Sequence, residues 1–129
     1  MSVSILVVDD EPDVAEMFRQ CFRREARNGT YVMHFANSGQ EALDKLATGI
    51  EPQLIVILSD INMPVMDGLE LLREIKTRRP YLPVMMVSAY GDDERLRLAG
   101  EYGAAEFITK PVDFDLLKTQ LRDLSDAAH

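Results

Sequence analysis

The residues of this chain that could do chemistry stand within two positions of the ends of short apolar runs. They are Asp9 and Asp10 after the run 5–8, Asp60 after the run 54–58, Ser88 after the run 84–87, and Lys110 after the run 106–109. Carboxylates next to a hydroxyl and an ammonium suit a divalent cation that accompanies a phosphoryl group, because Mg²⁺ prefers hard oxygen ligands and takes few protein carboxylates. The pattern predicts phosphoryl chemistry assisted by Mg²⁺ or Mn²⁺.

The elements that must position these residues alternate along the chain. The runs 5–8, 54–58 and 84–87 are uninterrupted, as in parallel strands covered on both faces, whereas 31–36 and 106–109 alternate and suit the edges of a sheet. Apolar residues recur at helical spacing between the runs: Val14, Met17, Phe18, Cys21 and Phe22; Ala42, Leu43 and Leu46; Leu69, Leu72 and Ile75; and Phe114, Leu117, Leu121 and Leu124. Residues 92–102 are the least clearly amphipathic helix, and a partner could use that face.

Five alternations of strand and helix predict an α/β fold with a doubly wound, five-stranded parallel sheet and helices on both faces. In such sheets the ligand lies beyond the carboxyl ends of the strands. The polar residues that follow the strands are therefore expected to meet at one edge of the sheet.

Length and charge narrow the class of protein. The 129 residues suffice for one domain, 1–129, with an ordinary core. The lone Cys21 excludes an internal disulfide and a thiolate metal site, which fits a reducing compartment. A net charge of −8 argues against a broad nucleic-acid surface, and the first residues form neither a signal peptide nor a membrane span. We expect a cytoplasmic protein that binds a protein or a cation.

Some of these residues also have a purely structural interpretation. Asp9 and Asp10 could form the turn and the N-cap of the helix that follows them, and Asp67 in "MDGLELL" has the position of an N-cap. His34 lies in an alternating strand and is expected to be structural or solvent-facing. Turns and caps explain the residues one at a time, but not their joint occurrence at successive strand ends.

Four segments in order, "ILVVDDEPDV", "SDINMPVMDGLELL", "VMMVSAYGD" and "EFITKPVD", resemble the receiver domain of two-component response regulators over practically the whole chain. The resemblance implies a flavodoxin-like sheet of order 2-1-3-4-5, as in the chemotaxis receiver. It implies these roles: Asp60 as phosphoacceptor; Asp10, Asp60 and the Asn62 carbonyl as metal ligands, with Asp9 acting through water; Lys110 as phosphate-binding lysine; Ser88 and Phe107 as the switch pair; and a cis peptide bond before Pro111.

The resemblance also implies a mechanism and partners. A sensor histidine kinase or phosphotransfer protein would supply the phosphoryl group to Asp60. Ser88 and Lys110 would move towards the phosphate, Phe107 would turn inward, and the surface of 92–102, 106–109 and the last helix would change. The chain would catalyse only its own phosphorylation and dephosphorylation, so it is not expected to be an enzyme. The downstream effector is open, direct nucleic-acid and membrane contacts are not expected, and a phosphorylation-dependent dimer is compatible with the resemblance.

Two residues are expected to set the lifetime of the phosphorylated state, and two other features depart from the common pattern of the family. Asn62 and Tyr90 would flank the water that hydrolyses the acyl phosphate, with Asn62 orienting it and Tyr90 shielding the phosphorus. Asn62→Ala is therefore predicted to lengthen the phosphorylated lifetime about tenfold and Tyr90→Ala to shorten it as much. The alternative is that Tyr90 points to solvent or to a partner and leaves hydrolysis unchanged. Ser88 replaces the commoner threonine but keeps the hydroxyl. The arginines of a long connection between the first helix and the second strand, Arg19, Arg23, Arg24 and Arg27, suit either the helix dipole and solvent or an acidic partner.

Other classes of protein fit less well. A haloacid-dehalogenase-type phosphatase would need an aspartate two positions after its nucleophile, where this chain has Asn62. A dinucleotide-binding domain would need a glycine-rich turn after the first strand, and "DDEPDV" has no glycine. A binding-only pseudo-receiver would lack an acidic or lysine position. One helix follows Lys110, and no output domain is expected in the chain. We therefore expect either a free-standing regulator or a receiver excised from a protein with a cyclase, kinase or other effector domain.

Overall fold

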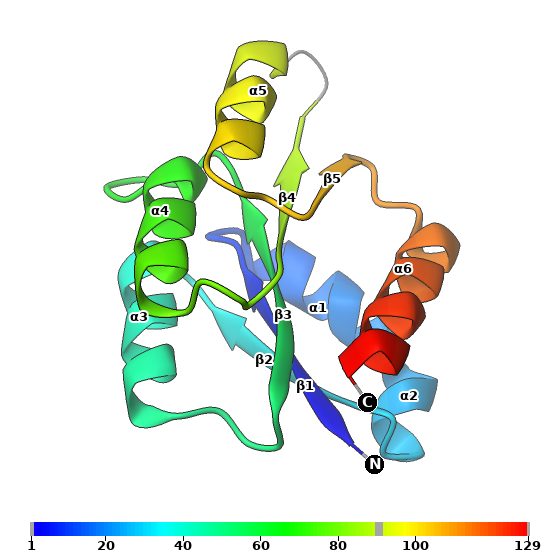
Figure 1. Cartoon of the computed structure of the whole chain (residues 1–129). Coiled ribbons are helices and arrows are strands. Elements are labelled where there is room, and N and C mark those ends of the chain that lie inside the picture. Colours follow the sequence, from blue (N-terminus) through cyan, green and yellow to red (C-terminus); the bar gives the residue numbers. More distant parts are fainter. Residues whose placement is uncertain (1, 90–91, 129) are drawn as a thin grey trace.

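The computed structural model describes residues 2–89 and 92–128, in which strands and helices alternate (Figure 1). The strands are β1 (Val3–Val8), β2 (Tyr31–Ala36), β3 (Leu54–Asp60), β4 (Val84–Ser88) and β5 (Glu106–Thr109). The helices are α1 (Pro12–Cys21), α2 (Arg23–Arg27), α3 (Gly39–Thr48), α4 (Gly68–Arg78), α5 (Asp93–Glu101) and α6 (Phe114–Ala128). Tyr90 lies outside the described residues, so the structure does not address its predicted role.

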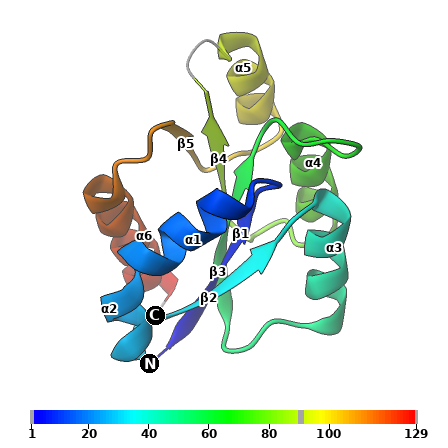
Figure 2. The ribbon, with the colours of Figure 1, turned by 180° about the vertical axis from the view of Figure 1, so that it is seen from behind.

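The five strands form one parallel sheet in the order β2-β1-β3-β4-β5, which confirms the predicted fold. The alternating runs are the edge strands β2 and β5, and the uninterrupted runs lie inside the sheet. Helices α1 and α6 cover one face, whereas α3 and α4 cover the other, as the two opposite views show (Figures 1 and 2). Every residue of β1 is buried, as expected for a strand covered on both faces.

Two apolar cores lie on the two faces of the sheet. On one face, Leu6 and Ile57 pack with buried residues of α3, α4 and α5. On the other, Ile5 and Leu58 pack with an aromatic group made by Phe18, Phe22, Tyr31 and Phe114. Successive strand residues therefore serve opposite cores, and this fixes the register that carries Asp60 to the end of β3.

Three local features differ from the expectation. The long connection after the first helix contains the short helix α2, and Phe22 between α1 and α2 is fully buried, so it closes the core at this turn. Met17, expected in the buried stripe, is 47% exposed because Phe18 and Phe22, four residues apart, occupy the face towards the sheet. The N-cap of α1 is Glu11, so neither Asp9 nor Asp10 caps this helix, but the Asp9 carboxylate accepts a hydrogen bond from the Glu11 amide at 3.0 Å and so forms the predicted turn.

Other local predictions are confirmed. The Asp67 side chain accepts a hydrogen bond from the Glu70 amide and caps α4. His34 is half-buried, with Nε2 3.1 Å from the Ser4 hydroxyl, and is therefore structural. The Lys110-Pro111 bond is cis, as is Glu51-Pro52. Within residues 2–89 and 92–128, no helix is both long enough and apolar enough to cross a membrane.

Candidate functional site

The carboxyl ends of β1 and β3 bring three carboxylates together. Asp9, Asp10 and Asp60 each offer an oxygen, and these oxygens lie within 4.8 Å of one another. The cause is the register of two neighbouring parallel strands, in which Val8 pairs with Ser59. Asp9 and Asp60 are 8% and 5% exposed, whereas Asp10 is open to solvent. Hard oxygen ligands at this spacing, one of them accessible, fit a divalent cation that keeps part of its water shell.

Lys110 brings a positive charge to the same cluster from the end of β5. Its Nζ lies 3.5 Å from Asp9 Oδ2 and 3.7 Å from Asp60 Oδ2. The backbone amide of Lys110 donates to the Ser88 carbonyl at 2.8 Å, which ties this residue to the end of β4. The half-buried ammonium is therefore held close to the buried carboxylate of Asp60.

The carboxylates destabilise one another's charge. Burial and the neighbouring Asp9 raise the pKa of Asp60 to about 6, although Lys110 and the Asn62 amide favour the ionised form. Burial disfavours the charge of Lys110, but the attraction of Asp60 and Asp9 prevails and raises its pKa. A cation bound among the three carboxylates would favour the ionised form of Asp60 and so suits this arrangement chemically.

A tight turn fixes the end of β3. The Ile61 amide donates to the Val87 carbonyl at 3.1 Å, and the Gly68 amide donates to the Ile61 carbonyl at 2.7 Å. A Cβ on Gly68 would collide with the Asp60 carbonyl and lie 2.7 Å from the Ile61 Cα. The absence of a side chain at Gly68 therefore lets α4 begin directly against the strand end that carries Asp60.

The switch candidates lie on two neighbouring strands, Ser88 at the end of β4 and Phe107 near the start of β5. Ser88 is buried, and its hydroxyl has no hydrogen-bond partner among the residues that the structure describes. Phe107 on β5 is 43% exposed. The structure thus places a buried hydroxyl and an outward aromatic in the two neighbouring strands β4 and β5.

Asn62 belongs to a group of polar contacts that sequence reasoning missed. Its Nδ2 donates to Asp92 Oδ2 at 3.1 Å, and its Oδ1 accepts from the Arg95 guanidinium. Arg95 also pairs with Asp67 at 2.8 Å. The residues stand about thirty positions apart in the chain, so no local pattern in the sequence reveals the group.

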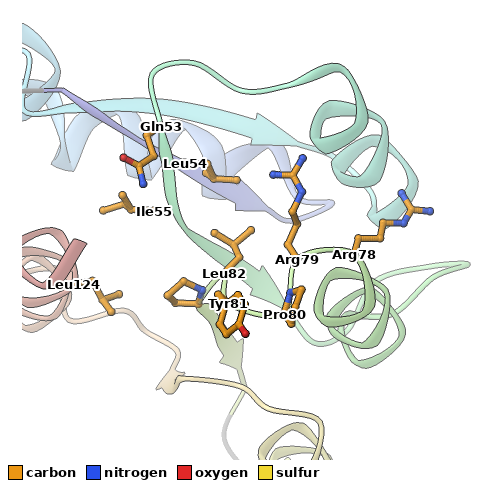
Figure 3. Close-up of a pocket in the computed structure, with 10 residues that line it drawn as sticks. Gln53, Leu54, Ile55, Arg78, Arg79, Pro80, Tyr81, Leu82 and Leu124 are labelled. Atoms are coloured by element: carbon orange, nitrogen blue, oxygen red, sulfur yellow. The ribbon is translucent and has the colours of Figure 1, made fainter. Parts of the chain in front are cut away.

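Two cavities differ in their relation to the cluster. A small one of about 140 Å³ touches Asp9, Asp60 and Lys110 and is closed on its other side by apolar residues such as Met17. The larger one, about 550 Å³, is lined by Leu54 and by the α4–β4 connection (Figure 3). Leu54 starts β3 and Asp60 ends it, so the large cavity lies about 20 Å from the carboxylates, at roughly 3.3 Å for each strand residue. It is not part of this site.

The sequence matches the family model of the response regulator receiver domain over residues 5–122. The chain therefore belongs to the receiver domain family of two-component response regulators.

Its relatives are regulators. The chain is 36% identical to the transcriptional regulatory protein ZraR of Klebsiella oxytoca over 94% of this chain and 26% of that protein. It is 37% identical to the regulatory protein AtoC of Escherichia coli (strain K12) over 88% of this chain and 23% of that protein. The chain spans about a quarter of the length of these curated relatives.

Solved structures of response regulator proteins have the same fold as this chain. A response regulator receiver domain protein from Clostridium thermocellum has a TM-score of 0.85 at 27% identity and covers 98% of this chain and 96% of its own. The response regulator protein TrrA from Thermotoga maritima, in complex with Mg²⁺ and BeF, has a TM-score of 0.79 at 32% identity. The match covers 95% of this chain and 98% of the TrrA chain.

Proposed function

We propose that this chain accepts a phosphoryl group on Asp60 from a sensor histidine kinase or phosphotransfer protein and transmits the change through the surface of α5, β5 and α6. These elements correspond to the fourth helix, fifth strand and fifth helix expected from the sequence, because α2 adds one helix to the count. The observation that carries the proposal is the buried Asp60 carboxylate, with two further carboxylates and the Lys110 ammonium around it.

The residues around Asp60 have different roles in the proposed phosphoryl transfer. Asp10, Asp60 and the Asn62 carbonyl would hold Mg²⁺ or Mn²⁺, with Asp9 acting through water, and the cation would neutralise phosphoryl oxygens. A carboxylate oxygen of Asp60 attacks the phosphorus, so an O–P bond forms while the bond to the donor breaks and its electron pair leaves with the donor. Lys110 neutralises charge on the transferred group. The Mg²⁺ and BeF named for TrrA support this assignment.

The same residues connect the phosphoryl group to the output surface. New acceptor oxygens on Asp60 attract the Ser88 hydroxyl and the Lys110 ammonium. Movement of Ser88 vacates space, which Phe107 fills from its exposed position on the neighbouring strand. The partner of this surface is an effector that prefers one of its two arrangements.

The whole protein's output depends on more than this chain. We propose that residues 1–129 are one receiver domain, which acts free-standing or as part of a longer regulator with a cyclase, kinase or other effector domain. The partial coverage of ZraR and AtoC supports the second form. A Mg²⁺-dependent aspartate-nucleophile phosphatase is the alternative enzyme, and Asn62 at the position of its second aspartate argues against it.

Intact-mass measurement after incubation with acetyl phosphate tests the proposal. Wild type should gain one phosphoryl group with Mg²⁺ and none when a chelator removes the cation. Asp60→Asn should gain none under either condition. Asp44→Asn, which changes an exposed aspartate on α3, is the matched control and should behave as wild type. A gain that persists in Asp60→Asn would overturn the assignment of the phosphoacceptor.

A further inference from the structure

Arg95 connects α5 to the segment that follows Asp60. One guanidinium nitrogen lies 2.8 Å from Asp67 Oδ2, and the other donates to Asn62 Oδ1. The remaining polar group of the Asn62 side chain, Nδ2, donates to Asp92 at the start of α5. Both ends of the Asn62 amide are thus held by residues of α5 and its N-cap, although Asn62 itself stands two positions after the candidate phosphoacceptor.

The contact between Arg95 and Asp67 differs from the ordinary ion pairs of the same helix. Arg97, two residues further on, pairs with Glu94 and Glu101, both within α5, and its side chain is 56% exposed. The side chains of Arg95 and Asp67 are 36% and 26% exposed, so solvent screens their attraction less. Asp67 is also fixed as the N-cap of α4. Arg95 therefore fastens α5 to a rigid neighbour, whereas Arg97 stabilises only its own helix.

We propose that Arg95 is a clamp that holds α5 against residues 62–67 in the unphosphorylated protein, and that this clamp opens when the α5, β5 and α6 surface switches. The inference rests on the proposed function. Asn62 stands two positions after Asp60, and its side chain is held by Asp92 and Arg95. A phosphoryl group on Asp60 therefore acts next to the contacts that hold the start of α5. Arg95 acts as a positioning residue that favours the resting arrangement, and its removal favours the switched one.

Beryllofluoride with Mg²⁺, a phosphoryl mimic, allows the clamp to be tested by amide NMR titration of four proteins. Arg95→Ala removes the clamp from α5. Asp67→Asn removes it from α4 but keeps the cap, because asparagine caps helices as well as aspartate does. The double variant completes a thermodynamic cycle. Arg97→Ala removes two ion pairs from α5 without touching α4 and is the matched control.

If the clamp exists, Arg95→Ala and Asp67→Asn should each bind beryllofluoride about threefold more tightly than wild type. The double variant should bind it no more tightly than either single variant. Arg97→Ala should bind it with wild-type affinity. Direct electrostatics predicts otherwise, because losing a positive charge near an anion weakens binding and losing a negative charge strengthens it. A common direction for two opposite changes of charge therefore identifies the clamp. Without the mimic, resting amide resonances of α5 and β5 should already shift towards their bound positions in both variants.

Opposite directions for the two single variants, or wild-type affinity in Arg95→Ala, would overturn the clamp. Failure of wild type to bind the mimic, or equal binding by Asp60→Asn, would instead contradict the proposed function and remove the basis of the clamp. Thermal unfolding of each variant verifies that it folds. If Arg95→Ala does not fold, Asp67→Asn and Arg95→Lys, which keeps the charge but loses the fork of two donors, give the same comparison.

Discussion

Asp60 is a carboxylate that the fold makes hard to ionise. It is 5% exposed and close to Asp9, and its pKa is raised to about 6. The folded, metal-free protein therefore holds a proton on this residue at pH values where the unfolded chain has lost it. The free energy of unfolding falls as the pH rises from about 4 through 6, because the unfolded state gains more from ionisation. The burial of the proposed phosphoacceptor therefore lowers the stability of the metal-free protein at neutral pH.

The first prediction isolates this effect. In the presence of a chelator at pH 7.5, Asp60→Asn should unfold with a free energy about 2 kcal/mol above wild type, within the limit of about 3 kcal/mol set by 1.4 kcal/mol for each pKa unit. The difference should shrink as the pH falls towards 4, where wild-type Asp60 is protonated, and it should also shrink when Mg²⁺ stabilises the ionised carboxylate. Urea unfolding across this pH range measures it.

The control for this prediction is Asp44→Asn, an exposed aspartate of α3. Its difference from wild type should stay small over the whole pH range. A difference between Asp60→Asn and wild type that is constant from pH 4 to 7.5 would mean that packing, and not ionisation, separates the two proteins.

At the scale of elements, the close approach of α4 to β3 positions Asp60. Gly68 begins α4 with its amide bonded to the Ile61 carbonyl. The atoms that an added Cβ would meet first belong to the backbone of Asp60 and Ile61. Backbone cannot move aside as the end of a flexible side chain can. Any larger residue must therefore push the helix and the strand end apart.

Gly68→Ala should accordingly lower the free energy of unfolding by about 2 kcal/mol, as overpacking does elsewhere, and slow phosphorylation by acetyl phosphate, because it displaces Asp60. Gly100→Ala in α5 is the matched control, since its Cβ would lie 3.6 Å from Phe107, an ordinary contact. Alanine is the better helix former, so this control should be neutral or up to about 1 kcal/mol more stable. Thermal unfolding and intact mass over time provide both measurements, and equal effects of the two substitutions would contradict the argument.

Elements of this kind differ in how far the sequence predicts them. The five strands, their edge or central places and the meeting of Asp9, Asp60 and Lys110 follow from local patterns, because all parallel strands end at the same edge. Helix α2 was missed because five residues are too few for a periodic pattern to be recognised. The Arg95 contacts were missed because they depend on how α5 is rotated against α4, which packing decides. The exposure of Met17 was missed for the same kind of reason, because packing also decides how α1 is rotated against the sheet.

At the scale of the whole molecule, Ser88 and Phe107 are the proposed link between the carboxylate cluster and the surface of α5, β5 and α6. The Ser88 hydroxyl is buried without a hydrogen-bond partner among residues 2–89 and 92–128, an arrangement that costs a protein about 1–3 kcal/mol. Phe107 is an aromatic residue that remains 43% exposed. Each group would be better placed if the hydroxyl met phosphate oxygens and the ring turned inward.

Ser88→Ala should therefore affect the two states in opposite directions. The resting protein should be as stable as wild type or up to about 1 kcal/mol more stable, because no hydrogen bond is lost. Phosphorylation of Asp60 should persist, but the amide shifts that beryllofluoride induces in α5 and β5 should diminish. NMR spectra of the free and bound forms decide the second part and thermal unfolding the first. Equal shifts in wild type and variant would remove Ser88 from the switch.

The exposed ring of Phe107 has a consequence for background signalling. The exposure of the Phe107 ring and the lack of a partner for the Ser88 hydroxyl among residues 2–89 and 92–128 both disfavour the resting arrangement. They therefore narrow the free-energy gap between the two arrangements of the proposed switch. A narrow gap means that a small fraction of unmodified molecules transiently adopts the output conformation. We expect relaxation-dispersion NMR to detect this exchange at β5, and a flat dispersion profile there would rule it out. The surface of α5, β5 and α6 would then give a faint basal output even without a phosphoryl group on Asp60.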